Sequence, residues 1–354
     1  MSLPSGVPAP WFHAGSPQNP RFAFASMGGQ YVVLAFLPPP GPQRDAALQA
    51  VVDRRGLFND ETAVFFGVLP DAASCAAAVN KPPFRWFFDP EGEIAALYDA
   101  KTPDGAYLPQ WVLLDPTLRV LGTVPIEAGP AALDNLAGLG SPQDFAGVPV
   151  NAPVLIVPRV LEPNLCRSLI DLYNRTGGRP SGVMVQRDGK TVGVIDDFKR
   201  RRDAEIDDPD LRQQVRARIV RRLIPEIQKV FQYTVTRIER YIVACYDASD
   251  GGYFRAHRDN TTTATAHRRF AVSMNLNAEE FEGGDLRFPE FGRKTYRPPT
   301  GGAVVFSCSL LHEATAVTRG TRYATLPFLY DEEANKVREA NAHTLQAGSS
   351  EDRP

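Results

Sequence analysis

Cysteine is scarce in this sequence, because its 354 residues include only Cys75, Cys166, Cys245 and Cys308. The four are widely spaced and form no Cys-x-x-Cys pair, which argues against a disulfide framework. Scattered thiols in a chain of this size are typical of reduced, buried residues in a cytoplasmic protein. We therefore expect free cysteines and a cytoplasmic location.

Long apolar runs and a strong net charge are also missing. The longest runs, such as Tyr31–Leu37 and Ala303–Phe306, have the length of a strand and are far too short to cross a membrane. Residues 1–6 contain neither a basic nor an apolar stretch, so we expect no secretory signal. With a formal net charge of -2, nothing points to nucleic acid or an anionic membrane as a partner.

Residues 1–143 alternate short apolar segments with helical segments. Strands are expected at Tyr31–Leu37, Val64–Leu69 and Gln110–Leu114, with helices at Arg44–Arg55 and Ala72–Val79. This strand–helix–strand order predicts an α/β domain. Residues 138–152, rich in glycine and proline, are expected to form a linker.

Residues 150–334 have a different pattern, which predicts a mainly-β jelly roll with flanking helices. Helices are expected at Pro163–Thr176 and Pro209–Phe231. Short strands separated by Gly- and Pro-rich turns then follow one another, as in a sandwich or jelly-roll barrel. Residues 335–354 form a polar tail that we expect to be frayed. The expected strands are Ile238–Tyr246, Phe270–Asn277, Gly284–Phe288, Ala303–Ser307 and Arg322–Tyr330.

A metal site is predicted by His257, Asp259 and His312. Residues two apart on a strand face the same side, so His257 and Asp259 can reach one point in space. His312 follows the apolar strand Ala303–Ser307 and can supply a third ligand from a different strand. Two imidazoles and one carboxylate on one face of an ion leave other positions open, which suits non-haem Fe(II). A His-x-Asp pair alone is common in sequences and does not specify a metal.

Arg322 adds a fourth element to this pattern. It lies ten residues after His312, across a turn that contains Gly320, and begins the last apolar strand. A guanidinium can pair with a carboxylate through two hydrogen bonds, and its charge does not titrate in the physiological range. Beside an iron site, Arg322 would bind the distal carboxylate of a dicarboxylic 2-oxo acid.

With these motifs in place, residues 237–330 resemble the catalytic domain of the prolyl 4-hydroxylase branch of the Fe(II)- and 2-oxoglutarate-dependent dioxygenases. The segment Val243–Tyr246, followed by a Gly-containing loop and His-x-Asp-Asn, is particularly similar to the oxygen-sensing prolyl hydroxylases. Collagen-type members carry a lysine at the position of Arg322, and both side chains bind a carboxylate. The matching positions include Tyr246, Gly252, His257, Asp259, Asn275–Asn277, Gly283, Gly284, Gly301, Phe306, His312 and Arg322.

The resemblance implies a double-stranded β-helix and a complete set of reactants. The cofactor would be Fe(II), the cosubstrates 2-oxoglutarate and O₂, and ascorbate a reductant that rescues oxidised iron. Tyr246 would hydrogen-bond 2-oxoglutarate. The reaction would be C–H hydroxylation with release of succinate and CO₂.

Residues 1–143 resemble a peroxiredoxin, within the thioredoxin-like fold. In that family the loop after the first of these strands carries the peroxide-reacting cysteine, whereas residues 38–44 of this chain contain no cysteine. Without a thiolate there is no nucleophile, so we expect a degenerate module for docking, dimerisation or substrate presentation. The matching segments are Pro10–Phe12, Tyr31–Leu37, Phe88–Gly92 and Trp111–Asp115.

Two polar features lie outside the predicted site. His267, in a Thr-rich loop, is expected to be solvated, with contact to substrate as the alternative. The basic run Lys199–Arg202 is expected to be a solvated, flexible loop, with recruitment of an acidic or polypeptide partner as the alternative.

The primary substrate stays open at this point. A prolyl residue of a protein is one candidate, by resemblance alone. A small metabolite or free amino acid is another candidate substrate. As an alternative function, the chain could be a cupin-like or thioredoxin-like binding protein without turnover. A mobile loop at residues 182–202 bordering an open groove would favour a polypeptide, whereas a small closed pocket would favour a metabolite.

Overall fold

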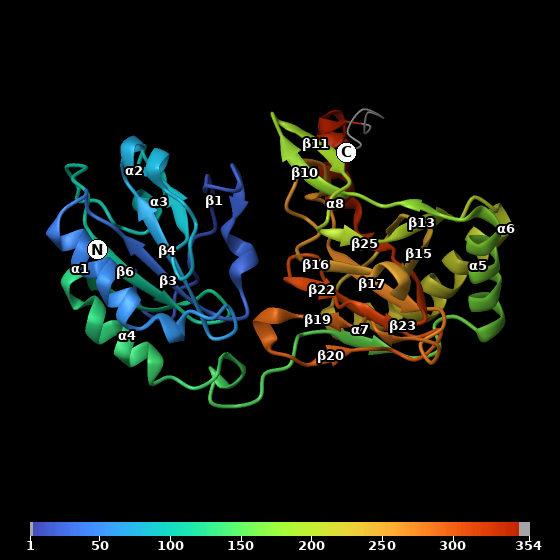
Figure 1. The fold of residues 1–354 in the computed structure, drawn as a ribbon. Coiled ribbons are helices and arrows are strands. Elements are labelled where there is room, and N and C mark those ends of the chain that lie inside the picture. The colour runs from blue at the N-terminus through green and yellow to red at the C-terminus, as the bar shows by residue number, and fades with distance from the viewer. Residues whose placement is uncertain (1–2, 347–354) are drawn as a thin grey trace. The chain divides into compact units, whose positions relative to one another are not determined.

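A computed structural model of the chain describes residues 3–346. The chain forms two units, each with its own sheet (Figure 1). The first is Met1–Ala152 with the short segment Pro289–Arg293, and the second is Pro153–Phe288 with Lys294–Pro354. Within residues 3–346, no helix combines the length and the apolar character needed to cross a bilayer.

The first unit is built on a mixed five-stranded sheet of order β5-β4-β3-β6-β7. β3, β4 and β5 are parallel, whereas β6 runs antiparallel to both β3 and β7. A βαβ unit followed by a ββα unit is the topology of the thioredoxin-like fold, which confirms the predicted fold class. The strands are β3 Tyr31–Phe36, β4 Ala63–Leu69, β5 Trp86–Phe88, β6 Gln110–Leu114 and β7 Val120–Pro125, with a separate ribbon of β1 His13–Ala14 and β2 Phe22–Ala23.

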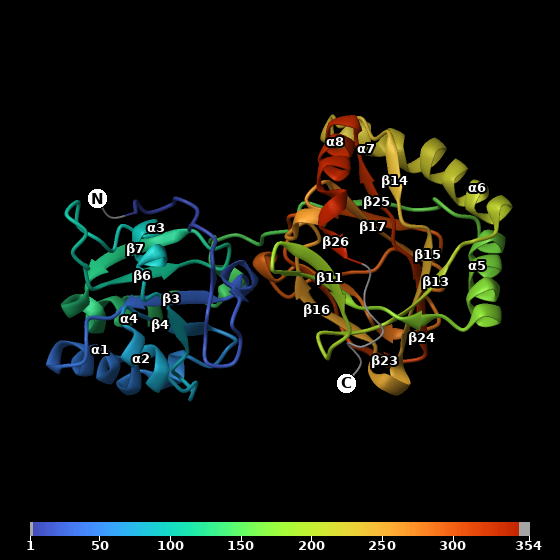
Figure 2. The ribbon, with the colours of Figure 1, turned by 90° about the horizontal axis from the view of Figure 1, so that it is seen from above.

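Helices cover both faces of this sheet (Figure 2). Neighbouring residues of β3 point to opposite faces, as strand geometry requires. Val33 packs with Val51 and Leu133 on the face covered by α1, α2 and α4, whereas Leu34 packs with Ile94 of α3 on the other face. The helices are α1 Pro42–Asp53, α2 Ala72–Ala77, α3 Glu93–Leu97 and α4 Gly129–Ala137.

The first unit has no thiol at the N-terminus of α1. That helix begins at Pro42, directly after Gly41. Cys75, in α2, is the only cysteine of residues 1–152 and is partly buried. Burial raises the pKa of the Cys75 thiol, which disfavours the reactive thiolate. The position at which the resemblance places the peroxide-reacting cysteine is therefore occupied by other residues in this unit.

The second unit contains a large antiparallel sheet of order β14-β25-β17-β24-β15-β13-β9, to which β21 and β8 add alongside β17. A smaller sheet has the order β12-β16-β22-β19-β20. Residues of both sheets line one pocket, as in the double-stranded β-helix that the sequence predicts. The large sheet consists of β8 Leu155–Val157, β9 Arg179–Pro180, β13 Arg202–Glu205, β14 Arg237–Glu239, β15 Ile242–Asp247, β17 Phe270–Asn275, β21 Ala303–Ser307, β24 Thr321–Thr325 and β25 Phe328–Tyr330. The small sheet consists of β12 Lys199–Arg200, β16 Tyr253–His257, β19 Leu286–Arg287, β20 Thr295–Tyr296 and β22 His312–Ala314, and a separate ribbon pairs β18 Glu282–Gly283 with β23 Val317–Arg319.

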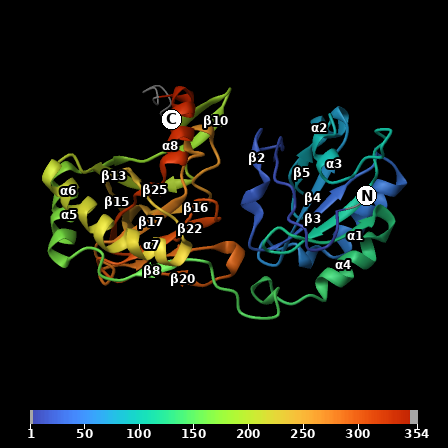
Figure 3. The ribbon, with the colours of Figure 1, turned by 180° about the vertical axis from the view of Figure 1, so that it is seen from behind.

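Three helices cover the outer face of the large sheet (Figure 3). In β15, Val243 and Cys245 point outward into the core that these helices share. Ala244 and Tyr246 point the other way, toward the pocket side. Alternation along this one strand therefore determines which side chains reach the site. The helices are α5 Pro163–Thr176, α6 Pro209–Arg218 and α7 Ile224–Phe231, and a π-helical turn over Ile219–Leu223 joins the last two.

Two strands predicted as continuous are interrupted. The strand expected at Ile238–Tyr246 is broken between β14 and β15, where Arg240 has a φ of 68°. The strand expected at Arg322–Tyr330 is broken between β24 and β25, at Leu326 and Pro327. Proline has no N–H for a ladder hydrogen bond, which accounts for the second break.

The expectation of a frayed tail after Asp331 is wrong for residues 332–346. Helix α8 spans Glu332–Asn341, and the Asp331 carboxylate caps it by accepting the N–H of Ala334 at 2.8 Å. Strand β26, Leu345–Gln346, pairs in parallel with β11. This mostly polar helix docks through the fully buried Ala334 and through hydrogen bonds that Arg338 donates to the Tyr330 hydroxyl and Asn341 donates to the Thr263 carbonyl, both at 2.9 Å. Residues 347–354 lie outside the described residues.

Within residues 182–202, residues 183–194 form a regular hairpin. Strand β10, Val183–Arg187, pairs with β11, Lys190–Val194, over five residue pairs. Because β26 pairs with the other edge of β11, β11 is the central strand of a three-stranded sheet.

Candidate metal and cosubstrate site

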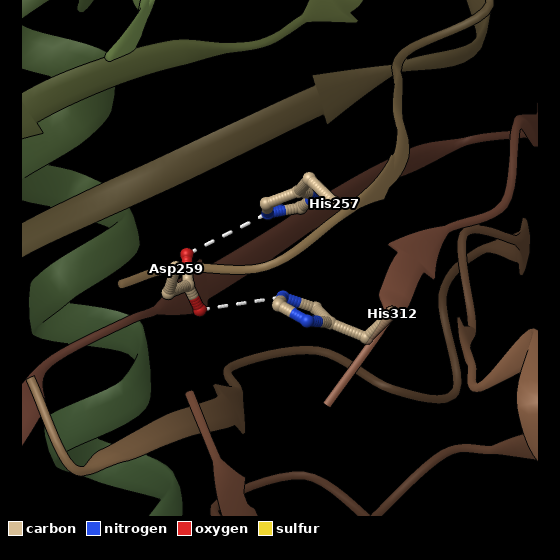
Figure 4. Close-up of side chains that lie close together, drawn as sticks. All are labelled: His257, Asp259 and His312. Carbon is tan, nitrogen blue, oxygen red and sulfur yellow. Dashed lines mark ion pairs between the residues drawn. The ribbon is translucent and has the colours of Figure 1, made fainter. Parts of the chain in front are cut away.

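His257, Asp259 and His312 converge at one point, as the sequence predicts. His257 ends β16 and His312 begins β22, and the two are directly paired across the small sheet. Their Nε2 atoms lie 3.6 and 3.4 Å from the two carboxylate oxygens of Asp259 (Figure 4). Bonds of about 2.1 Å to a shared ion would place neighbouring donor atoms about 3 Å apart, so a small closure would complete the site.

Backbone contacts determine the tautomer of both histidines. The His257 Nδ1 lies 2.7 Å from the Arg255 carbonyl oxygen, and the His312 Nδ1 lies 3.0 Å from the Leu310 carbonyl oxygen. Since a carbonyl can only accept, each Nδ1 carries the hydrogen and each Nε2 presents a lone pair. Ring contacts also restrain the imidazoles, because Phe254 stacks on His257 at 3.5 Å and Phe306 lies against His312 at 4.6 Å between ring centroids.

The protonation states of His312 and Asp259 fit a metal ion. Burial, with the neighbouring His257, lowers the pKa of His312 to about 4, so this imidazole is neutral at pH 7. Burial acts to raise the pKa of Asp259, but His312 and His257 outweigh it and the pKa lies below its ordinary value. Neutral imidazole and ionised carboxylate are the ligand forms that bind divalent metals. The donor set therefore fits the Fe(II) that the sequence predicts.

Arg322 is buried beside these residues without a carboxylate partner. Its guanidinium donates to Asn275 Oδ1 at 3.2 Å, to the Gly284 carbonyl at 2.7 Å and to Ser273 Oγ at 2.8 Å. Among the described residues, no carboxylate lies within ion-pair distance of it. Burial lowers the pKa of Arg322, yet a guanidinium stays protonated in proteins. A buried charge held only by neutral acceptors is suited to an anionic ligand.

Gly284 allows Arg322 to lie close to the backbone. Its φ is 66°, and a Cβ atom there would lie 2.8 Å from Val317 Cγ2 and 3.2 Å from Arg322 Cδ. Glycine adopts this conformation without steric cost and leaves room for the arginine. The glycine pair noted in the sequence therefore has a local structural role.

Tyr246 lies directly opposite Arg322, on β15 and β24. The Arg322 guanidinium carbon is 5.2 Å from the centroid of the Tyr246 ring. Arg201 Nη1 donates to the Tyr246 hydroxyl at 3.4 Å, and Arg201 is in turn paired with Asp203 at 2.6 Å. Because the hydroxyl oxygen accepts from Arg201, its own hydrogen is free to point at a ligand.

One pocket contains all five of these residues, with an empty volume of about 460 Å³ that includes its open mouth. Its lining comes from both sheets and mixes cationic with apolar side chains. The residues are Arg201, Arg240, Tyr246, Phe254, His257, Asp259, Ala271, Val272, Ser273, Leu286, Phe306, His312, Ala314, Arg322, Leu326 and Phe328.

The expectation that Lys199–Arg202 is a solvated loop is wrong for half of its residues. Lys199 and Arg201 are buried, whereas Arg200 and Arg202 are exposed. This alternation follows from the extended conformation of β12 and β13, which sends successive side chains to opposite sides. Lys199 donates to Ser181 Oγ at 2.7 Å, and burial followed by the charge of Arg201 keeps its pKa well below the ordinary value.

His267 is likewise buried rather than solvated. Its Nε2 lies 2.5 Å from a carboxylate oxygen of Glu239, which also pairs with Arg268 at 2.7 Å. The ring packs edge-on against Tyr330, with centroids 4.9 Å apart. It belongs to a polar cluster beside the pocket and is not among the residues lining it.

The sequence reasoning missed Arg201 and Arg240 as pocket residues. Arg201 could have been found from strand geometry. If the basic run Lys199–Arg202 is extended, every second side chain points to the same side and can be buried. Arg240 lies within the segment that was predicted as one continuous strand. Its polar side chain between apolar residues was the one feature of the sequence that could have indicated the break.

Known proteins match the second unit over its central segment. Residues 241–330 match the profile of the 2OG-Fe(II) oxygenase superfamily. A PKHD-type hydroxylase of Synechococcus sp. (strain JA-2-3B'a(2-13)) is 26% identical over 98 residues, which cover 26% of this chain and 43% of that protein. The chain thus spans about two-fifths of the length of the curated relatives that it matches first.

Solved structures match both units with low overall similarity. A viral collagen prolyl hydroxylase of Paramecium bursaria Chlorella virus 1 is 17% identical and covers 50% of this chain and 94% of its own, with a TM-score of 0.38. A Chlorobium tepidum structure described as a thiol:disulfide interchange protein is 22% identical and covers 38% of this chain and 96% of its own, with a TM-score of 0.33.

The matched segment contains every residue of the predicted site. It begins before Tyr246 and ends after Arg322, and it includes His257, Asp259 and His312. The superfamily uses Fe(II), 2-oxoglutarate and O₂, and the donor set described above fits the metal. Over residues 241–330, this chain therefore carries a domain of the 2OG-Fe(II) oxygenase superfamily.

Proposed function

We propose that this chain is a non-haem Fe(II)- and 2-oxoglutarate-dependent dioxygenase that hydroxylates a C–H bond. The single observation that carries the proposal is the convergence of two imidazole Nε2 atoms and one carboxylate in a pocket that also holds Arg322, which has no carboxylate partner among the described residues. One oxygen atom of O₂ would enter the new hydroxyl group, and the other would enter succinate as CO₂ leaves 2-oxoglutarate. The bound iron would supply the activation of O₂ that no side chain can provide.

The residues of the chain have separate roles in this proposal. His257, Asp259 and His312 hold the metal, and the backbone carbonyls on each Nδ1 keep both imidazoles in the binding tautomer. Arg322 binds the distal carboxylate of 2-oxoglutarate, and the Tyr246 hydroxyl donates a hydrogen bond to the same molecule. Phe254 and Phe306 exclude water on either side of the histidines.

Two kinds of molecule are candidates to carry the target C–H bond. A prolyl residue of a protein is proposed from the similarity of the motifs to prolyl 4-hydroxylases. A small metabolite or free amino acid is the second candidate, and one observation favours it. The pocket is framed by buried side chains, and residues 183–194, whose mobility would have favoured a polypeptide, form a hairpin that pairs with β26.

The proposal also covers the cellular compartment, the reductant and the role of the first unit. All four cysteines are free, which supports a reducing compartment such as the cytoplasm. Ascorbate would serve as the reductant that restores Fe(II). We propose that the thioredoxin-like unit, which has no thiol at the N-terminus of α1, acts in docking or dimerisation.

Release of CO₂ from carboxyl-labelled 2-oxoglutarate without a primary substrate tests the activity. Slow decarboxylation is expected for the wild-type protein with Fe(II), and none for Asp259→Ala. Arg255→Ala is the matched control, because Arg255 lies four residues before Asp259, on β16, with an exposed side chain. The proposal fails if the wild-type protein releases no CO₂ or if Asp259→Ala releases it at the same rate.

A further inference from the structure

The pocket contains a second unpaired guanidinium, that of Arg240. Its Nε and Nη2 donate to one acceptor, the carbonyl oxygen of Leu326, at 2.9 and 2.7 Å. Its guanidinium carbon lies 4.4 Å from the centroid of the Phe328 ring. Among the described residues, no carboxylate lies within ion-pair distance of Arg240 and no acceptor is bonded to its Nη1. The Nη1 group of Arg240, a residue that lines the pocket, is therefore available to donate hydrogen bonds to a ligand.

Nearby acidic side chains are engaged elsewhere. Glu239, the preceding residue, is bound by His267 and Arg268, and Asp203 is bound by Arg201. Asp259 is the one carboxylate among the residues that line the pocket, and it faces the two histidines. Burial, with the charges of Arg201 and Arg268, lowers the pKa of Arg240 to about 10, so the group is still charged at pH 7.

Counting charges under the proposed function leaves Arg240 without a counter-ion. The two positive charges of Fe(II) and the one of Arg322 balance the one negative charge of Asp259 and the two of 2-oxoglutarate. Arg201 is balanced by Asp203. Among the charged side chains that line the pocket, that of Arg240 then remains without a counter-ion in a partly buried site, where an uncompensated ion is costly.

Arg240 also lies away from the residues proposed to bind the cosubstrate. Tyr246 and Arg322 are cross-strand partners on β15 and β24. Arg240 precedes β15, six residues before Tyr246, and bonds to Leu326, which follows β24. Because both strands are extended, Arg240 lies at the opposite end of the strand pair from Arg322. Apolar side chains of Ala271, Leu326 and Phe328 line the pocket around it.

We propose that Arg240 binds a carboxylate of the primary substrate. This inference rests on the proposed function, and it names a chemical class: an organic acid with an apolar carbon skeleton. The carboxylate would sit on the guanidinium, and the skeleton would extend along the apolar wall toward the metal. A free acid and the C-terminal carboxylate of a peptide share this chemistry.

The test uses the full chain loaded with Zn(II), which binds the same ligands without redox chemistry, and with 2-oxoglutarate to occupy Arg322. The arginine Nε–H resonances are followed by NMR while acetate is added, and acetamide is the neutral control probe. We expect a saturable shift of the Arg240 resonance with acetate and none with acetamide. Arg240→Gln identifies the resonance and should weaken acetate binding by about tenfold or more, the loss of one charge-assisted hydrogen bond.

Two further variants keep the test decisive. Arg237→Gln removes an equal charge from an exposed residue paired with Glu332, and acetate binding should be unchanged in it. If Arg240→Gln does not fold, Arg240→Lys provides the assignment, and the wild-type titration decides the result. The absence of a saturable Arg240 shift, or an equal shift with acetamide, would overturn the inference.

The same NMR titration distinguishes a free acid from the C-terminal carboxylate of a peptide. It also separates the carboxylate site at Arg240 from the proposed dioxygenase function. Tighter binding of L-proline than of glycyl-proline would assign a small free acid, and the reverse would assign a polypeptide end. The Arg322 resonance, followed while 2-oxoglutarate is added, reports on the proposed function separately. If the Arg322 resonance does not move, the proposed function fails whatever acetate does at Arg240.

Discussion

Tyr246 and Arg322 face each other across β15 and β24, with the guanidinium carbon 5.2 Å from the ring centroid. Arg322 donates only to neutral acceptors, so its charge is available to a ligand. We predict that Arg322→Gln raises the 2-oxoglutarate concentration needed for half-maximal decarboxylation by about 30-fold or more, the loss of a charge-assisted pair. Arg322→Lys should restore part of this loss, because lysine retains the charge but not the fork.

Arg319→Gln is the matched control for that prediction. Arg319 lies three residues earlier, is exposed and pairs with Glu282, so its replacement removes an equal charge away from the pocket. Equal effects of the two substitutions would show that Arg322 acts through general electrostatics and not by contact with the cosubstrate.

The Arg201–Tyr246 hydrogen bond predicts coupling between these two residues. Tyr246→Phe should weaken 2-oxoglutarate binding by about tenfold, because the donated hydrogen bond is lost. In an Arg201→Lys background the same change should cost less, since the hydroxyl is no longer oriented by the guanidinium. A double-mutant cycle on the dissociation constant measures the coupling, and strictly additive effects would contradict the positioning role of Arg201.

The Glu239 cluster predicts how stability depends on pH. Burial raises the pKa of Glu239, but hydrogen bonds from His267 and Arg268 outweigh it and lower the pKa to about 2. A carboxyl whose pKa is depressed in the folded state stabilises the fold above its unfolded pKa, and this stabilisation is lost as pH falls toward 2. Glu239→Gln should therefore lower the free energy of unfolding at pH 7 by about 2 to 3 kcal/mol.

Chemical denaturation of the wild-type protein and Glu239→Gln between pH 7 and pH 2 checks this prediction. The difference between them should shrink below about pH 4.5, where the unfolded carboxyl becomes protonated. Glu332→Gln is the control, because its partner Arg237 forms an exposed pair that contributes little. A difference that stays constant over the whole range would show that Glu239 acts through packing and not through charge.

Strand β26 predicts a stabilising role for the end of the chain. Removing residues 342–354 deletes β26 and the His343 carbonyl that accepts from Lys190 at 3.0 Å. The amides of Thr191 and Val192 should then exchange with solvent faster, because β11 loses a neighbouring strand. Removing only residues 347–354 leaves β26 intact and should not change their exchange. Equal exchange in both truncated proteins would show that β26 does not protect the hairpin.

Residue type, order and spacing in the sequence, together with the family resemblance, predicted the convergence of the proposed metal ligands His257, Asp259 and His312 near Arg322. The sequence placed His257 and Asp259 two apart on one strand, whereas in the structure His257 ends β16 and Asp259 lies in the segment that follows it. His312 begins β22 and Arg322 lies in β24, so strand geometry accounts for their positions but not for that of Asp259. The order of apolar segments predicted an α/β domain for residues 1–143, and the resemblance to peroxiredoxins implied its thioredoxin-like topology.

The polar parts of the second unit could not be predicted in this way. The burial of Lys199, Arg201 and His267 depends on partners far away in the sequence, such as Ser181, Tyr246 and Glu239. The ordering of residues 332–346 depends on one buried methyl group at Ala334 and on pairing with β11. The periodicity of hydrophobic residues in a sequence does not show which distant residues pair with one another.

The most direct test of the central claim is an anaerobic titration of the metal-free protein with Fe(II) and 2-oxoglutarate, followed by the weak visible charge-transfer band of the ternary complex. We predict a band in the wild-type protein, none in His257→Ala, and a need for much more 2-oxoglutarate in Arg322→Gln. A wild-type protein that gives no band, or a His257→Ala variant that retains it, would contradict the assignment of this pocket as an Fe(II) and 2-oxoglutarate site.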